Sequence, residues 1–219
     1  MNYQAAVFDM DGLLLDTERV CQQAFRDACI SLSLPMLEEV YLGIIGCNAE
    51  GIKEVICNGY GADLDYEALR VEWMGRYHPI VEQQAIPVKE GVIALLNYLK
   101  AQQIPIAVAT STHKELAITK LKLAGLLEYF EQISAGCEVT HGKPSPEIFL
   151  LAAKRLNTLP QQCLAFEDSS NGVRAAMAAG MQVYHVPDLV RPSDDIIALG
   201  HTISDSLTDA LDHLKARNN

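Results

Sequence analysis

The sequence has no apolar run that approaches the ~18 residues a membrane helix requires. Its N-terminus has no basic stretch followed by an apolar one, which is the pattern of a secretory signal. It also lacks stretches rich in lysine and arginine, and its formal net charge of -11 disfavours binding to nucleic acid. We therefore expect a cytoplasmic protein with no membrane segment, no nucleic-acid partner and, by default, a monomeric state.

Several familiar motifs are also absent. The six cysteines include no C-x-x-C pair and no histidine partners at zinc-finger spacing, so we expect free thiols and neither a disulfide framework nor a zinc site. No G-x-x-x-x-G-K-S/T, G-x-G-x-x-G or H-E-x-x-H string occurs, which excludes P-loop, dinucleotide-binding and zinc-protease sites. With 219 residues, the chain is long enough for one full core with a modest insertion.

Short apolar runs alternate with helical periodicity over residues 88–215. Uninterrupted apolar runs predict strands buried on both faces of a parallel sheet at 5–9, 105–110, 164–168 and 183–187. Weaker strand patterns lie near Ile133 and at 201–204. Between the strands, apolar residues recur at i, i+3, i+4 and i+7, as in the series from Val92 to Leu99. The alternation predicts an α/β fold with a doubly wound parallel sheet.

Residues 16–84 break this alternation. They contain no convincing buried strand, while apolar periodicity predicts helices around 21–32, 52–56 and 66–77. We expect an α-helical insertion at 16–84, with residues 1–15 and 85–219 forming the core. Trp73 and Tyr77, one helical turn apart, are expected to pack inside the insertion. Such an insertion would lie over the C-terminal end of the first strand, where α/β sheets bind ligands.

Four groups of polar residues follow predicted strands. They are Asp9 with Asp11, Thr110 with Ser111, Lys143, and Glu167 with Asp168. Alone, the first acid pair can be a turn, the Thr-Ser pair and the second acid pair can be helix caps, and the lysine can be a solvated loop residue. Four such groups in order on successive strand–helix units favour a single site at one edge of the sheet.

This set suits phosphoryl transfer with an aspartate nucleophile. A carboxylate and a phosphate dianion repel each other, by about 4 kcal/mol for two unit charges ~4 Å apart at an effective dielectric of ~20. The site must therefore supply positive charge. Lys143 can contribute one unit, and a Mg²⁺ ion held by Asp9, Asp168 and Glu167 can contribute two more.

The other polar residues can bind phosphate and move protons. The hydroxyl of Thr110 and the backbone N–H groups that follow it, starting with Ser111, can hold phosphate oxygens at a helix start. Asp11 can protonate the leaving oxygen in a first step and deprotonate a water molecule in a second. Gly12 would let the chain turn directly after the acids.

These residues resemble the four motifs of the haloacid dehalogenase (HAD) superfamily of phosphotransferases. FDMDGLLLDTE is similar to the first motif, ATST to the second, GKPSPEIF to the third and FEDSSNG to the fourth. The resemblance implies a Rossmann-like core, a mobile helical cap, Mg²⁺ dependence and an aspartyl-phosphate at Asp9. It also implies that Mg²⁺ is bound by the Asp9 side chain, the Asp11 backbone carbonyl and Asp168.

Within the superfamily, the chain resembles the branch of β-phosphoglucomutase and small phosphosugar or phosphonucleoside phosphatases. HGKPSPEIFLLAAKR and FEDSSNGVRAAMAAGMQV are similar to pseudouridine-5′-phosphatase. The mutases have a histidine in the first cap helix and a Lys-Gly-x-x-Arg segment in the cap, whereas this chain has Cys21 and Ile45-Gly46-Cys47-Asn48-Ala49. Losing two cap cations disfavours a mutase, which must hold a bisphosphate.

We therefore predict a Mg²⁺-dependent phosphomonoesterase acting on a small phosphorylated metabolite, either a phosphosugar or a nucleoside monophosphate. A β-phosphoglucomutase-like mutase and a non-catalytic phosphate-binding regulator are the alternatives. The second acid disfavours the regulator, because a pure binder gains nothing from another carboxylate facing an anion. Position alone suggests substrate contacts in the insertion at Glu18, Arg19, Gly46, Asn48 and Tyr77.

Overall fold

The computed structural model describes residues 3–47 and 49–218. Asn48, one of the suggested substrate contacts, lies outside the described residues. The chain divides into two compact units: one comprises Met1–Asp16 and Pro87–Asn219, and the other comprises Thr17–Ile86. The second unit interrupts the first after its opening strand, and the role of this helical unit as a cap stays a prediction.

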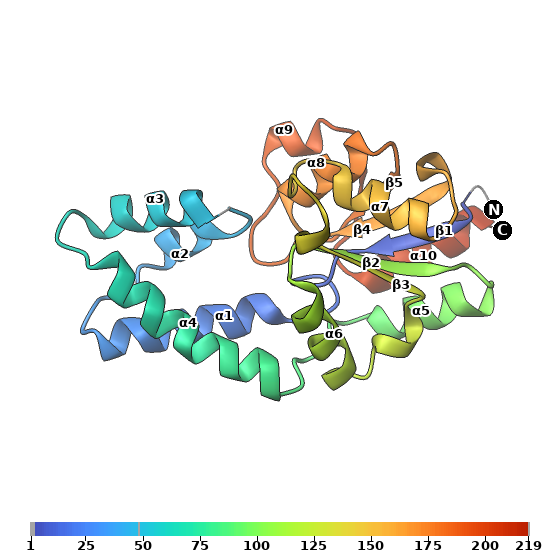
Figure 1. Ribbon diagram of the computed structural model, residues 1–219. Helices are drawn as coiled ribbons and strands as arrows, with labels where there is room; N and C mark the ends of the chain where they lie inside the picture. Colours follow the sequence, from blue (N-terminus) through green and yellow to red (C-terminus); the bar gives the residue numbers. More distant parts are fainter. Residues whose placement is uncertain (1–2, 48, 219) are drawn as a thin grey trace. The chain divides into compact units, whose positions relative to one another are not determined.

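The larger unit is built on a parallel sheet of six strands with helices on both faces (Figure 1). Its strands are β1 (Ala5–Phe8), β2 (Ile106–Thr110), β3 (Gln132–Ala135), β4 (Cys163–Glu167), β5 (Gln182–His185) and β6 (Thr202–Ile203). Their order in the sheet is β3-β2-β1-β4-β5-β6. This order confirms the doubly wound fold, and β3 and β6 are the two weakly patterned strands. The order reverses between β1 and β4, the position at which such sheets bind ligands.

The helices of the larger unit follow its strands. They are α5 (Val92–Ala101), α6 (Lys114–Leu123), α7 (Glu147–Arg155), α8 (Ser170–Ala178), α9 (Asp194–Ile197) and α10 (Leu207–Asn218), with short 3₁₀ turns η1 (Leu127–Tyr129), η2 (Gly136–Glu138) and η3 (Pro160–Gln162). One face of the sheet is covered by α7 and α8, whose buried side chains form a continuous core with alternate residues of the strands. Helices α5 and α10 pack against each other.

A row of aromatic side chains crosses the sheet one residue before the predicted acids. Strand register aligns Phe8 of β1 with Phe166 of β4 and Phe166 with Tyr184 of β5. Their rings stack, with centroids 4.5 Å apart for the first pair and 5.3 Å apart for the second. All three are fully buried, so the polar residues that follow them stand on a dry, closely packed layer.

The smaller unit is helical in its described residues. It contains α1 (Thr17–Ser31), α2 (Glu38–Ile44), α3 (Ala49–Tyr60) and α4 (Tyr66–Gln83). Trp73 of α4 is buried in its core, where its ring meets Phe25 edge-on at 5.0 Å and its Nε1–H donates to the Cys21 carbonyl at 3.1 Å. Tyr77 packs, partly buried, against the same core. Trp73 and Tyr77 therefore pack inside the insertion, as predicted.

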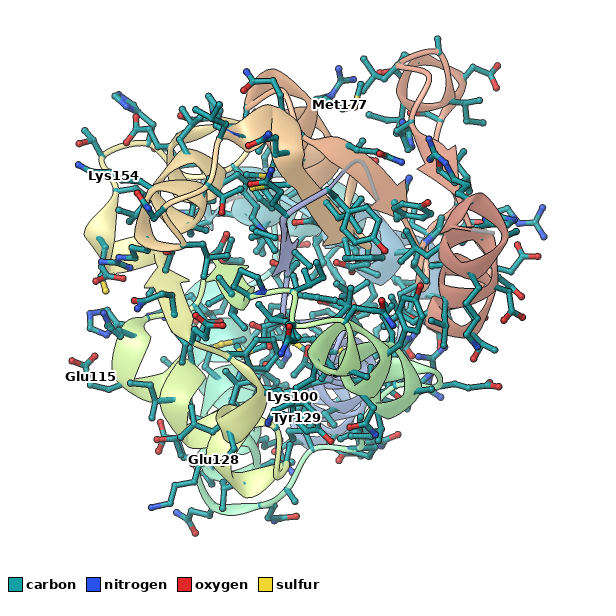
Figure 2. All side chains as sticks on the ribbon, turned by 90° about the vertical axis from the view of Figure 1, so that its right-hand side faces the viewer. Lys100, Glu115, Glu128, Tyr129, Lys154 and Met177 are labelled. Atoms are coloured by element: carbon teal, nitrogen blue, oxygen red, sulfur yellow. The ribbon has the colours of Figure 1, made fainter. Side chains whose placement is uncertain are left out.

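The surface of the larger unit carries charged side chains as well as single exposed apolar ones such as Ile93 and Leu159. Glu115, Glu128 and Lys154 are exposed, and Figure 2 shows them at its periphery. Lys100 of α5 lies over the ring of Tyr129 in η1, with Nζ 5.3 Å from the ring centroid (Figure 2). None of the cysteines in the described chain forms a disulfide, and no described helix is both long and apolar enough to cross a membrane.

Candidate active site

Asp9 follows β1 directly and lies at the switch point of the sheet. Its backbone N–H donates to the carbonyl of Phe166 in β4 at 3.0 Å, and its carboxylate accepts a hydrogen bond from Lys143 Nζ. The same ammonium donates to Glu167 Oε1 at 2.5 Å and to the Ala109 carbonyl at 3.0 Å. A single lysine therefore joins the ends of β1, β2 and β4.

The loop between η2 and α7 delivers this lysine. Glu147, the first residue of α7, holds the loop: its Oε2 accepts hydrogen bonds from the backbone N–H groups of Thr140 at 2.8 Å and His141 at 3.1 Å. The side chain of Lys143 is only 7% exposed, and its ammonium lies 5.1 Å from the centroid of the Phe149 ring. The loop thus places a buried cation against Asp9.

Glu167 ends β4 and is fully buried. Its Oε2 accepts hydrogen bonds from the backbone N–H groups of Asp168 and Ser169 and from the Ser169 hydroxyl, each at 3.0 Å. Ser169 in turn caps α8, since its Oγ accepts from the Gly172 N–H at 3.1 Å. A Cβ on Gly172 would lie 1.9 Å from the Glu167 carboxylate, so only glycine fits beneath that group.

Burial and neighbouring charges shift the pKa values of this cluster. Burial raises the pKa of Asp9 to about 7, with the Lys143 ammonium opposing the rise and the Glu167 carboxylate adding to it. Burial lowers the pKa of Lys143, but the two carboxylates outweigh that effect and hold it above its ordinary value. Lys143 is therefore charged at neutral pH. A further cation nearby would stabilise the ionised form of Asp9.

Asp168 completes a group of three carboxylates with Asp9 and Glu167. One ligand oxygen from each lies within 4.8 Å of the others, and two of the three residues are buried. Hard carboxylate oxygens are the ligands that small divalent cations prefer. Three carboxylates lie together here and the Lys143 ammonium bonds to two of them, so the donor set and its charge fit a divalent cation.

Asp11 lies just beyond and is held by residues of α6 and of the turn before it. Its Oδ2 accepts a hydrogen bond from the Thr112 hydroxyl at 2.6 Å, and its Oδ1 accepts one from Lys120 Nζ at 2.8 Å. The Asp11 side chain is 24% exposed, whereas that of Lys120 is 2% exposed. Gly12, with φ of 85°, turns the chain here, and its N–H donates to the Leu15 carbonyl at 2.9 Å.

Thr110 and Ser111 lie where β2 ends. Thr110 is buried, and its Oγ1 accepts from the Thr112 N–H at 3.1 Å, which leaves its own hydroxyl proton to donate. Ser111 is exposed in the turn before α6. Gly136 approaches this turn closely, since a Cβ there would lie 2.3 Å from the Ser111 carbonyl oxygen.

The structure brings Asp9, Lys143, Glu167 and Asp168 into one cluster, with Asp11 and Thr110 sharing a neighbour in Thr112. Sequence reasoning missed Thr112, Lys120 and Gly172. The signal for Lys120 was its position: with Ala117 and Leu121 it occupies the buried stripe of α6, where an apolar residue is the norm.

Residues 3–180 match the haloacid dehalogenase-like hydrolase family. The phosphorylated carbohydrates phosphatase of Thermotoga maritima is 34% identical over 82% of this chain and 82% of its own. The probable pseudouridine-5′-phosphatase of Drosophila melanogaster is 36% identical over 83% of this chain and 80% of its own.

Among solved structures, CbbY from Rhodobacter sphaeroides in complex with phosphate is similar, with a TM-score of 0.72 and 28% identity over 94% of this chain and 96% of that one. The family match covers most of the sequence and includes all four motif segments. The curated relatives named here are phosphatases. The chain belongs to the haloacid dehalogenase-like hydrolases.

Proposed function

We propose that this protein is a Mg²⁺-dependent phosphomonoesterase that forms an aspartyl-phosphate at Asp9. The observation that carries the proposal is the Asp9 carboxylate at the switch point of the sheet, paired with a buried lysine and placed beside two further acids. A lone carboxylate would repel a phosphate dianion, whereas this one has a fixed cation at hydrogen-bond distance.

Asp9 is the proposed nucleophile. Lys143 orients its carboxylate, and its ammonium is placed to attract the oxygens of an incoming phosphoryl group. Glu167 is the positioning residue for that ammonium, because it accepts from Nζ at 2.5 Å while three donors from the start of α8 fix its other oxygen. The arrangement needs no movement of charge when the substrate arrives.

Asp9, Asp168 and Glu167 would hold the Mg²⁺ ion, with the Asp11 backbone carbonyl as a further ligand. When bound, Mg²⁺ supplies positive charge that offsets the repulsion between the nucleophile and the phosphate. Thr110, with a hydroxyl proton to donate, and the backbone after it at Ser111 would hold phosphate oxygens.

The reaction proceeds in two displacements at phosphorus. In the first, a carboxylate oxygen of Asp9 bonds to phosphorus, the ester P–O bond breaks, and Asp11 gives a proton to the departing alkoxide. In the second, Asp11 takes a proton from water, the water oxygen bonds to phosphorus, and the bond to Asp9 breaks. The products are the alcohol and inorganic phosphate, and both aspartates return to their starting forms.

The proposed substrate is a small phosphorylated metabolite, a sugar phosphate or a nucleoside monophosphate. Support comes from relatives named for phosphorylated carbohydrates and for pseudouridine 5′-phosphate, each covering more than four-fifths of this chain. The helical unit, which we propose acts as the cap, contains none of the residues assigned to the chemistry, so we assign substrate choice to it.

Hydrolysis of a generic aryl phosphate tests the class of reaction. We expect wild type to release inorganic phosphate only with Mg²⁺, and Asp9→Asn to lose at least ~10³-fold in kcat/KM. Asp212→Asn removes the same charge from the exposed face of α10 and serves as the matched control, expected to keep wild-type activity. Undiminished turnover by Asp9→Asn would refute the nucleophile assignment.

A panel of sugar phosphates and nucleoside monophosphates, ranked by kcat/KM, then identifies the substrate class. Release of inorganic phosphate in step with loss of the monoester is the expected result. Isomerised sugar phosphate without phosphate release would contradict a hydrolase and favour a mutase.

A further inference from the structure

We propose that Lys120 of α6 and Thr112 of the turn before it are positioning residues for Asp11, holding it in the orientation needed for proton transfer to the leaving group. This inference rests on the proposed function and extends it to Lys120, outside the four motif segments, and to Thr112, the last residue of ATST, to which sequence reasoning gave no role. The juxtaposition behind it is a buried lysine and a threonine on the two oxygens of one carboxylate.

Burying the ammonium group of Lys120 on the inner face of α6 costs free energy. Ala117, Lys120 and Leu121 are the buried residues of this helix, at i, i+3 and i+4 on its inner face. Burial of an ammonium costs several kcal/mol unless it is paired, and well-packed apolar residues in place of a buried ion pair are often neutral or stabilising. Fold stability alone therefore gives little reason for a lysine here.

The partner of this lysine is an acid of the proposed mechanism. Lys120 Nζ is 2.8 Å from Asp11 Oδ1, and the Thr112 hydroxyl is 2.6 Å from Oδ2, so the two contacts fix the carboxylate from both sides. Asp11 itself lies in a turn after β1 and is 24% exposed. The contacts from Lys120 and Thr112 restrict the rotamers that this side chain can adopt.

Orientation matters most when the leaving group needs a proton. An alkoxide from a sugar phosphate is a poor leaving group and depends on the proton from Asp11, whereas nitrophenolate departs without one. The value of kcat/KM reports the steps up to formation of the aspartyl-phosphate, in which the leaving group departs. A defect in placing Asp11 should therefore appear in kcat/KM for an alkyl phosphate and much less for nitrophenyl phosphate.

The test compares these two substrates for Lys120→Met. We expect its kcat/KM for the best alkyl phosphate to fall roughly 10- to 100-fold, part of the ~10²- to 10⁴-fold that general acid–base catalysis contributes. With nitrophenyl phosphate it should stay within about threefold of wild type. Lys120→Arg should recover part of the loss, and Asp11→Asn should show the same substrate pattern with a larger loss.

Lys122→Met is the matched control, because Lys122 lies exposed on the same helix and its substitution removes the same charge. If Lys120→Met fails to fold, Thr112→Val removes the 2.6 Å hydrogen bond, keeps the ion pair and allows the same comparison. Equal losses on both substrates, or activity equal to that of Lys122→Met, would overturn the inference. Inactive wild type, or an active Asp9→Asn, would instead mean that the proposed function itself fails.

Discussion

Gly172→Ala is predicted to displace the Glu167 carboxylate and so to lower both stability and activity. Gly172 is the third residue of α8, and in a helix this change normally stabilises by up to about 1 kcal/mol, since alanine has the higher helix propensity. Here an ideal Cβ would lie 1.9 Å from both Cδ and Oε1 of Glu167 and 2.2 Å from Oε2. Glu167 is fully buried and has no open space to enter, so either its carboxylate or the start of α8 must move.

The cost follows from the hydrogen bonds that fix Glu167. Its carboxylate accepts from Lys143 Nζ at 2.5 Å and from three donors of Asp168 and Ser169 at 3.0 Å. A hydrogen bond to a charged group contributes about 1.5 to 3 kcal/mol, so losing two of the four costs at least about 3 kcal/mol. Subtracting the helix-propensity gain leaves a net destabilisation of about 2 kcal/mol, or roughly 4 to 8 °C in melting temperature.

The assay is thermal unfolding followed by circular dichroism, paired with kcat for the aryl phosphate. Gly75→Ala is the control: Gly75 lies inside α4, a Cβ there meets nothing within 4 Å, and the change should be neutral or stabilising by up to about 1 kcal/mol. Gly172→Ala should melt lower and lose activity. A variant that melts at or above the wild-type temperature with full kcat would refute the reasoning about Glu167.

Two further predictions concern pH and metal. Hydrogen bonding by Arg155 and Lys114 holds the pKa of Glu138 below its ordinary 4.5, so Glu138→Gln should destabilise by about 1 kcal/mol at pH 7. A carboxylate with a lowered pKa stabilises the fold fully above pH ~4.5 and loses this effect as the pH falls below that value. The difference in free energy of unfolding between wild type and variant, measured with urea, should therefore shrink in acid. A difference that widens would contradict this. Mg²⁺ at about 100 times its Kd should stabilise wild type by about 2.7 kcal/mol in thermal unfolding and Asp168→Asn much less; equal shifts would rule out this metal site.

Much of the fold follows from local patterns in the sequence. Strands buried on both faces must be uninterruptedly apolar, which is why β1, β2, β4 and β5 were predicted within a few residues. β3, at the edge of the sheet, begins with an exposed and then a half-buried residue, and β6 has only two residues, so both left weak patterns. The short helix α2 was not predicted, since seven residues give too few turns for a clear period.

The site was predictable where residue type alone carries the chemistry. Acids, a lysine and a threonine at strand ends point to one edge of a parallel sheet, whatever the details of packing. Lys120 and Gly172 act through tertiary contacts, one with Asp11 more than a hundred residues earlier in the chain and one beneath Glu167. The apolar stripe of α6 marks Lys120 and the FEDSSNG segment contains Gly172, but only the structure shows which groups these residues contact.

Covalent phosphorylation of Asp9 is the step on which the proposed mechanism depends, and it can be tested by trapping the intermediate. Wild-type protein mixed with Mg²⁺ and substrate is quenched in acid within one turnover, and its peptides are analysed by mass spectrometry. We expect the peptide that contains Asp9 to gain one phosphoryl group, which is lost on treatment with hydroxylamine and is absent from Asp9→Asn. Turnover with no phosphorylated peptide, or with the group on another residue, would contradict it.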